Sequence, residues 1–173
     1  MSLVVLVGNP RPESRTHSAA VAAARAVAGA AGIDAEPVVI DLSALAPGLL
    51  LAEQSAEIGD ALAAVTSADL LVVASPTYKA TYTGLLKVFL DKLPSRALAG
   101  VVALPLLVMG APQHALAVEV HLRPLLVELG ATVPTPGLAL LESQFDRLDS
   151  VLAEWAGTIV SAVQGAVTAE VAR

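Results

Sequence analysis

Residues 8–18, Gly-Asn-Pro-Arg-Pro-Glu-Ser-Arg-Thr-His-Ser, bring together hydroxyl, amide and guanidinium groups that could bind an anion. They directly follow the apolar residues 3–7 and lead into a pattern typical of a helix. The amides at a helix N-terminus carry partial positive charge, and the planar fork of arginine suits phosphate. We therefore assign this segment to a phosphate group, and its candidate donors are Asn9, Arg11, Ser14, Arg15, Thr16 and Ser18.

The spacing in this segment differs from that of two common phosphate motifs. A single glycine excludes the GxGxxG dinucleotide fingerprint, and GxxxxGK[ST] of the P-loop is absent. For single residues an alternative is open, in which Ser14 or Thr16 only caps the helix and the arginines lie in solvent. The cluster as a whole favours phosphate.

A second polar segment, residues 76–84, lies between the apolar residues 69–74 and another helical pattern. Both tyrosines of the chain lie in it. In an open parallel sheet, ligands bind at the carboxyl ends of the strands. The segment could hold a planar ligand through backbone amides, hydroxyls and an aromatic wall, and the candidates are Pro76, Thr77, Tyr78 and Lys79. The alternative is that the tyrosines pack as half-buried rings and that Thr83 only caps the next helix.

A third loop, residues 110–114, follows the apolar residues 101–109. Adjacent strand ends in such a sheet converge on one crevice, so this loop is the third candidate wall of the site. Its candidate residues are Gly110, Pro112, Gln113 and His114. For His114, which begins a helical pattern, a solvated position is the default alternative.

The sequence offers no set of side chains for catalysis by the protein itself. It has no cysteine and no GxSxG motif, and its three histidines lack metal-ligand spacing with carboxylates. We therefore predict no catalytic side chain and no metal site. Phosphate donors, a loop for a planar ligand and few titratable groups indicate that a bound cofactor does the chemistry.

Alternating apolar runs and helical patterns must position these loops. Runs that are apolar throughout indicate strands buried on both faces, and strand–helix alternation predicts an α/β, three-layer, doubly wound parallel sheet in a single domain spanning residues 1–173. The strands are predicted at residues 3–7, 35–40, 69–74, 101–109 and 132–133. The helices are predicted at residues 16–31, 56–66, 83–93, 114–129 and 144–167, with loops at 43–51 and 134–137.

Composition narrows the class of protein further. The formal charge of −6 and the lack of a basic stripe argue against nucleic-acid binding. No apolar stretch is long enough to span a membrane, the N-terminus lacks the features of a signal peptide, and the absence of cysteine fits a reducing compartment, so we expect a cytoplasmic protein. Apolar residues make up 55% and charged residues 15%, which predicts a homo-oligomer, a homo-dimer or homo-tetramer.

Two of these segments resemble a known family. GNPRPESRTHS is similar to the GSxRxxSxT phosphate loop of the NAD(P)H-dependent FMN reductases, and ASPTYKATYTGLLKVFLDKLP to their SPxYxxxYxGxLKxxLDxLP segment. RALAG and then LPLLVMGAPQHALAVEVHLRPLL continue the resemblance, which covers residues 1–133. The chain is most similar to the sulfonate-utilisation branch, whose members hand reduced FMN to a partner monooxygenase.

The resemblance implies a flavodoxin-like fold with strand order 2-1-3-4-5. It also implies hydride transfer from NADPH or NADH to N5 of FMN, and a flavin-dependent monooxygenase as partner. By position it puts Arg11, Ser14, Thr16 and Ser18 around the FMN phosphate, with Asn9 in place of the family's usual serine. It puts residues 76–79 along the isoalloxazine, and Gly110, Pro112, Gln113 and His114 on the third side.

Other functions on the same scaffold stay open. One is a quinone, azo-dye or metal-oxyanion reductase that keeps FMN bound. Another is an electron carrier without turnover, which the neutral to basic loops disfavour because a carrier should have an acidic face around its flavin. A nucleotide-binding regulatory domain is the weakest of the alternatives.

Overall fold

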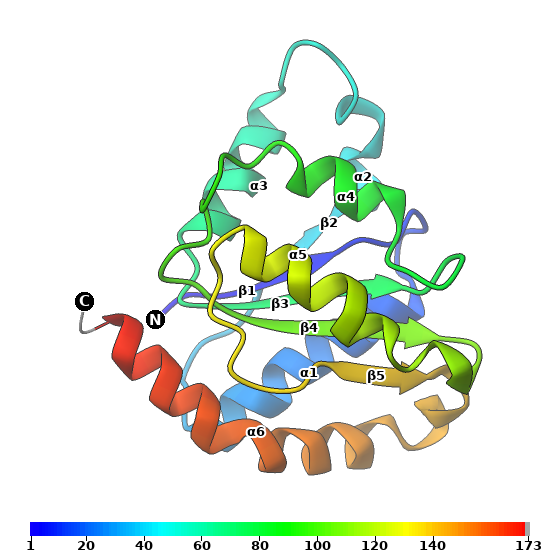
Figure 1. The fold of residues 1–173 in the computed structure, drawn as a ribbon, viewed down its shortest axis with the longest axis vertical. Helices are drawn as coiled ribbons and strands as arrows, with labels where there is room; N and C mark the ends of the chain where they lie inside the picture. Colours follow the sequence, from blue (N-terminus) through cyan, green and yellow to red (C-terminus); the bar gives the residue numbers. More distant parts are fainter. Residues whose placement is uncertain (172–173) are drawn as a thin grey trace.

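A five-stranded parallel sheet forms the middle layer of the protein, with the strand order β2-β1-β3-β4-β5. The computed structural model describes residues 1–171, and Figure 1 shows helices covering both faces of this sheet. The predicted strand order and doubly wound architecture are confirmed. The strands are β1 Leu3–Val7, β2 Val38–Asp41, β3 Leu70–Pro76, β4 Val102–Met109 and β5 Leu138–Leu141.

The three central strands, β1, β3 and β4, are buried along their whole length. Successive side chains of a strand point to opposite faces, so one strand supplies two cores. Val4 and Leu6 of β1 belong to the core on one face, whereas Leu3 and Val5 belong to the other. This double burial explains why apolar runs without alternation predicted the strands.

Figure 1 shows α1 and α6 on one face of the sheet and α2 to α5 on the other. Helix α1 packs against α6, and its small side chains Ala20 and Ala24 are fully buried in the core that both helices share with the sheet. The helices are α1 Arg15–Ala31, α2 Leu42–Leu45, α3 Ala56–Thr66, α4 Gly84–Leu90, α5 Arg123–Glu128 and α6 Leu148–Val171. Short turns add the 3₁₀ helices η1 Ala46–Gly48, η2 Pro112–His114 and η4 Glu142–Arg147, and the π-helical turn η3 Val118–Leu122.

The predicted position of the fifth strand is wrong. Thr132 makes only an isolated bridge to Val102, and the strand lies at Leu138–Leu141. Pro134 and Pro136 have no amide hydrogen to donate to a strand ladder, so pairing cannot continue through them. The chain returns to the sheet at Leu138, beside Leu106 of β4.

Several predicted boundaries also differ from the structure. The second strand begins at Val38 rather than at residue 35, and α2 and η1 occupy part of a predicted loop. The predicted helix over residues 114–129 is divided into η2, η3 and α5. The last helix is preceded by η4 and extends to Val171. Within residues 1–171, no helix is both long enough and apolar enough to cross a membrane.

Candidate functional site

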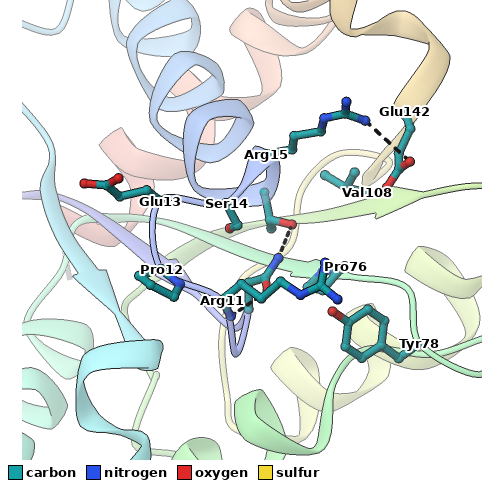
Figure 2. Close-up of a pocket in the computed structure, with 11 residues that line it drawn as sticks. Arg11, Pro12, Glu13, Ser14, Arg15, Pro76, Tyr78, Val108 and Glu142 are labelled. Atoms are coloured by element: carbon teal, nitrogen blue, oxygen red, sulfur yellow. Dashed lines mark hydrogen bonds and ion pairs between the residues drawn. The ribbon is translucent and has the colours of Figure 1, made fainter.

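A cavity of about 620 Å³ opens where β1, β3 and β4 end, as the sequence predicted (Figure 2). Its wall comes mainly from the loop between β1 and α1, with additions from the ends of β3 and β4 and from the first residue after β5. The lining residues are Asn9, Arg11, Pro12, Glu13, Ser14, Arg15, Thr16, Pro76, Tyr78, Val108 and Glu142.

Asn9 gives the loop after β1 its shape. Its side-chain Nδ2 donates to Thr16 Oγ1 at 3.0 Å, and its Oδ1 accepts from the backbone amide of Arg11 at 3.0 Å. Asn9 and Thr16 are both buried, so these bonds hold the loop as a closed turn against the start of α1. A hydroxyl and an amide that the sequence marked as anion donors therefore also form the frame of the loop.

The N-terminus of α1 lies at the edge of the cavity. Ser14 is its cap, and the Ser14 Oγ accepts from the amide of His17 at 3.2 Å, as the alternative interpretation of this residue expected. The first-turn amides of a helix have no acceptor within it and carry partial positive charge. Figure 2 shows Arg11 reaching across the cavity toward Tyr78, and Arg15 pointing toward Glu142. This end of the cavity combines helix amides, a hydroxyl and two guanidinium groups.

The loop after β3 forms a tight reverse turn that presents Tyr78. Tyr78 N donates to Thr81 O at 2.9 Å, and Thr81 N donates back to Tyr78 O at 3.2 Å. Lys79 and Ala80, between them, have φ of 53° and 65°, which are the positive values that a type I′ turn requires at both central residues. The turn leaves Tyr78 42% exposed at the cavity and puts Lys79 at its exposed tip.

Thr77 is anchored to the neighbouring strand, because its amide donates to Val108 O at 2.7 Å. Its hydroxyl oxygen is buried and has no hydrogen-bond partner among the residues that the structure describes. Buried polar atoms are nearly always paired, so an orphan next to a cavity needs an explanation.

Thr83 connects the loop after β1 with the loop after β3. Its Oγ1 donates to Gly8 O at 2.5 Å and accepts from the amide of Leu86 at 3.2 Å, and its amide donates to Ser75 Oγ at 3.0 Å. At Gly8, a Cβ would lie 2.6 Å from the Cβ of Leu86, so only glycine allows α4 to approach β1 this closely. Thr83 is therefore the cap that the sequence allowed for, and also a buried link between β1, β3 and α4.

The structure does not bring all predicted residues to the cavity lining. Ser18 lies on the outer side of α1, beside a separate hollow that includes His17 and Asp149. Thr77 lies next to the lining residues Pro76 and Tyr78 without being part of the lining. The other predicted residues outside it are Lys79, Gly110, Pro112, Gln113 and His114.

Glu142 is the main residue that sequence reasoning missed. It directly follows β5, and the misplaced fifth strand hid its position at the edge of the site. The apolar run at residues 138–141, directly after Gly137, was the signal that could have revealed it. Pro12, Glu13 and Val108 also line the cavity without having been predicted.

Glu119 and Arg123 together form a clamp that fixes the segment leading into β5. Glu119 Oε2 accepts from Arg123 Nε at 2.5 Å, and Glu119 Oε1 accepts from the amide of Gly137 at 2.6 Å. Arg123 also donates to the backbone carbonyl oxygens of Val133, at 2.9 Å, and Thr135. The hydrogen bond from Arg123 holds the pKa of Glu119 below its ordinary value, with a smaller contribution from Gly137.

Comparison with known proteins decides the family. The sequence profile described as NADPH-dependent FMN reductase matches residues 1–146. The chain belongs to the NADPH-dependent FMN reductase family. It is an NAD(P)H-dependent FMN reductase and hence an oxidoreductase, as the resemblance of the two loop segments predicted.

Two curated relatives of this reductase carry matching activities in their names. The FMN reductase (NADPH) of Escherichia coli strain K12 is 38% identical over 146 residues, which are 83% of this chain and 75% of that protein. The NADH-dependent FMN reductase SfnF of Pseudomonas putida is 35% identical over 164 residues, 87% of this chain and 88% of that protein.

Solved structures extend the comparison to the fold of the reductase. The apo form of the NADH:FMN oxidoreductase EMOB has a TM-score of 0.80 at 34% identity and covers 97% of this chain and 89% of its own. A flavodoxin-type WrbA-like protein from Agrobacterium tumefaciens has a TM-score of 0.63 at 18% identity, covering 95% of this chain and 99% of its own. The second likeness is to the fold alone, and it confirms the predicted flavodoxin-like architecture.

Proposed function

We propose that the 620 Å³ cavity is the flavin site of this reductase, with the FMN phosphate at the N-terminus of α1 and the isoalloxazine beside Tyr78. The observation that carries the proposal is the convergence of a helix N-terminus, two arginines and an exposed ring on a single cavity. Its volume falls within the range of about 300–1,000 Å³ typical of small-molecule sites.

The chemistry of the donors fits a phosphate dianion at one end. Amides at the start of α1 point outward with partial positive charge, and the hydroxyl of the cap Ser14 can donate. Arg11 and Arg15 add permanent positive charge and are exposed enough to reach a ligand. We assign the framing roles to Asn9 and Thr16, because their polar side-chain atoms already bond within the loop.

The other end of the cavity fits a planar polar ring. Pro76 and Tyr78 supply a flat, partly apolar wall, and the rigid turn over residues 78–81 fixes the direction of the tyrosine. The buried, orphaned hydroxyl of Thr77 lies next to this wall but outside the lining, so a heteroatom of the ring edge reaches it only if the loop shifts on binding. In the proposal, Gly110, Pro112, Gln113 and His114 close the outer side of the ring.

FMN supplies the redox chemistry when it is bound, since it accepts a hydride from the nicotinamide. The role of the protein is to bind, orient and shield FMN and the nicotinamide in one geometry, and such positioning can account for a large share of the rate enhancement. We infer that FMN exchanges as a substrate and that its reduced form reaches a flavin-dependent monooxygenase. The exposed positions of Arg11 and Arg15 support exchange.

We infer further that the reductase is a homo-oligomer. Large apolar side chains remain exposed on the segment from η2 to α5, namely Leu116 at 70%, Val120 at 56% and Val127 at 53%. Leu116 and Val120 are four residues apart and so share a helix face. Light scattering coupled to size-exclusion chromatography tests this inference, and a monomer at micromolar concentration would refute it.

Oxidation of NADPH and NADH, followed by absorbance with added FMN, FAD or riboflavin, tests the flavin site. Arg11→Gln should raise KM for FMN while leaving KM for riboflavin close to that of the wild type, because only FMN carries the phosphate. Lys92→Gln removes the same charge outside the cavity lining, just after the C-terminal end of α4, and serves as the control. Equal effects of Arg11→Gln on FMN and riboflavin would contradict the placement of the phosphate.

A further inference from the structure

A carboxylate faces the proposed phosphate end of the cavity. Two glutamates line the cavity, and Figure 2 shows them in opposite orientations. Glu13 turns its carboxylate away from Arg15, whereas Glu142 turns toward it, and Glu142 Oε2 lies 3.6 Å from Arg15 Nη1. A site for an anion thus contains one negative side chain paired with one of its two arginines.

The ion pair between Glu142 and Arg15 is weak, so Arg15 can readily exchange Glu142 for another anion. The distance of 3.6 Å is too long for a hydrogen bond, and the side chains are 65% (Arg15) and 54% (Glu142) exposed. Exposed ion pairs contribute little stability because solvent screens them. The guanidinium carbon of Arg15 also lies 5.8 Å from the centre of the Phe145 ring, which keeps the side chain near the cavity.

A phosphate is a better partner than a carboxylate for this arginine. It carries nearly two negative charges, and it can accept two parallel hydrogen bonds from a guanidinium. Arg15 is the first residue of α1, so a phosphate at the helix N-terminus would lie next to it. Binding there brings the dianion close to Glu142, whose charge opposes it.

We propose that Glu142 is an affinity- and specificity-determining residue that competes with the flavin phosphate for Arg15. Without flavin, the Glu142 carboxylate pairs with the guanidinium of Arg15. When FMN binds, its phosphate pairs with Arg15 instead, and the carboxylate of Glu142 then repels the phosphate. Glu142 therefore lowers the affinity for FMN and narrows the preference for FMN over unphosphorylated riboflavin. The inference rests on the proposed flavin site, and it explains how the reductase could release FMN readily.

Quenching of flavin fluorescence, titrated with purified protein, tests the proposal without any turnover. Glu142→Gln should bind FMN about three- to tenfold more tightly than the wild type, which is the effect of removing one charge several ångströms from a dianion near the surface. The affinity for riboflavin should not change. The gain should shrink in high salt, since salt screens exposed charges.

Glu36→Gln is the matched control. Glu36 also forms an exposed ion pair with an arginine, with 3.1 Å between its Oε2 and Arg25 Nη2, and it precedes β2, at the end of the parallel strands opposite to the cavity. This variant changes the net charge by the same amount and should leave FMN affinity unchanged. An equal gain in both variants would overturn the proposal in favour of an effect of overall charge.

A double-variant cycle isolates the competition for Arg15. Arg15→Gln should weaken FMN binding, and Glu142→Gln should gain much less in that background than in the wild type. Full additivity would overturn the competition, and an unchanged or weakened FMN affinity in Glu142→Gln would overturn the inference as a whole. If instead neither Arg11→Gln nor Arg15→Gln affects FMN affinity, the proposed flavin site itself fails.

Discussion

Replacing Thr83 by valine should destabilise the reductase and loosen its flavin site. Valine has nearly the shape of threonine but lacks the hydroxyl, so the variant loses the cap of α4 and the bond to Gly8 O. Loss of a cap destabilises by about 1 kcal/mol. A buried carbonyl left without a partner adds about 1–3 kcal/mol. Because Thr83 is only 3% exposed, water cannot replace the bond, and we expect about 2–4 kcal/mol in total.

Urea denaturation of three variants measures this prediction. Thr83→Ser keeps the hydroxyl and should retain most of the stability. Ser55→Ala removes the exposed cap of α3, where Ser55 Oγ accepts from the amide of Ile58 at 3.4 Å, and should lose about 1 kcal/mol. Thr83→Val should lose more stability than Ser55→Ala. It should also bind FMN more weakly, because Gly8, which loses its bond to Thr83, is the first residue of the phosphate loop. Equal losses in the two variants would refute the reasoning that Thr83 links β1 to α4.

Other positions carry further predictions. Tyr78→Ala should raise the Kd for FMN yet keep turnover at saturating FMN, and abolished turnover in a steady-state assay would contradict a positioning role. Gly137→Ala should destabilise the protein by about 1–3 kcal/mol in urea denaturation, because a Cβ there would collide with the side chain of Val118. Stability equal to that of the wild type would contradict such tight packing. Glu119 has a lowered pKa in the folded state, so its stabilisation is complete above its ordinary pKa of about 4.5 and is lost as the pH falls through the folded value. The stability gap between the wild type and Glu119→Gln should accordingly close in acid, and a gap that stays constant with pH would argue against the ion pair with Arg123.

Local sequence signals were enough for most of the fold. The strands predicted at residues 3–7 and 101–109 correspond to β1 and β4, which are apolar throughout because both faces of the sheet are covered, and this pattern needs no tertiary information. The helix predicted at residues 56–66 coincides with α3 because Ser55 caps it. The position of the fifth strand was not predicted, because prolines interrupt the segment before it. That position depends on contacts with β4 and on the hydrogen bonds of Arg123.

The candidate site was predictable only where it lies on continuous segments. Arg11, Ser14 and Tyr78 belong to loops that follow buried strands, so their convergence follows from the parallel sheet. Glu142 comes from a distant part of the chain, and only the crossover into β5 brings it to Arg15. Oligomeric state and a cytoplasmic location stay predictions, because they depend on more than the fold of one chain.

A crystal structure of the reductase soaked with FMN tests the central claim most directly. We predict phosphate density about 3 Å from the Ser14 hydroxyl and the first amides of α1, with Arg15 turned from Glu142 toward it and the flavin ring beside Tyr78. Flavin bound elsewhere, for example in the hollow that includes His17 and Asp149, or bound with its phosphate away from α1, would contradict the account.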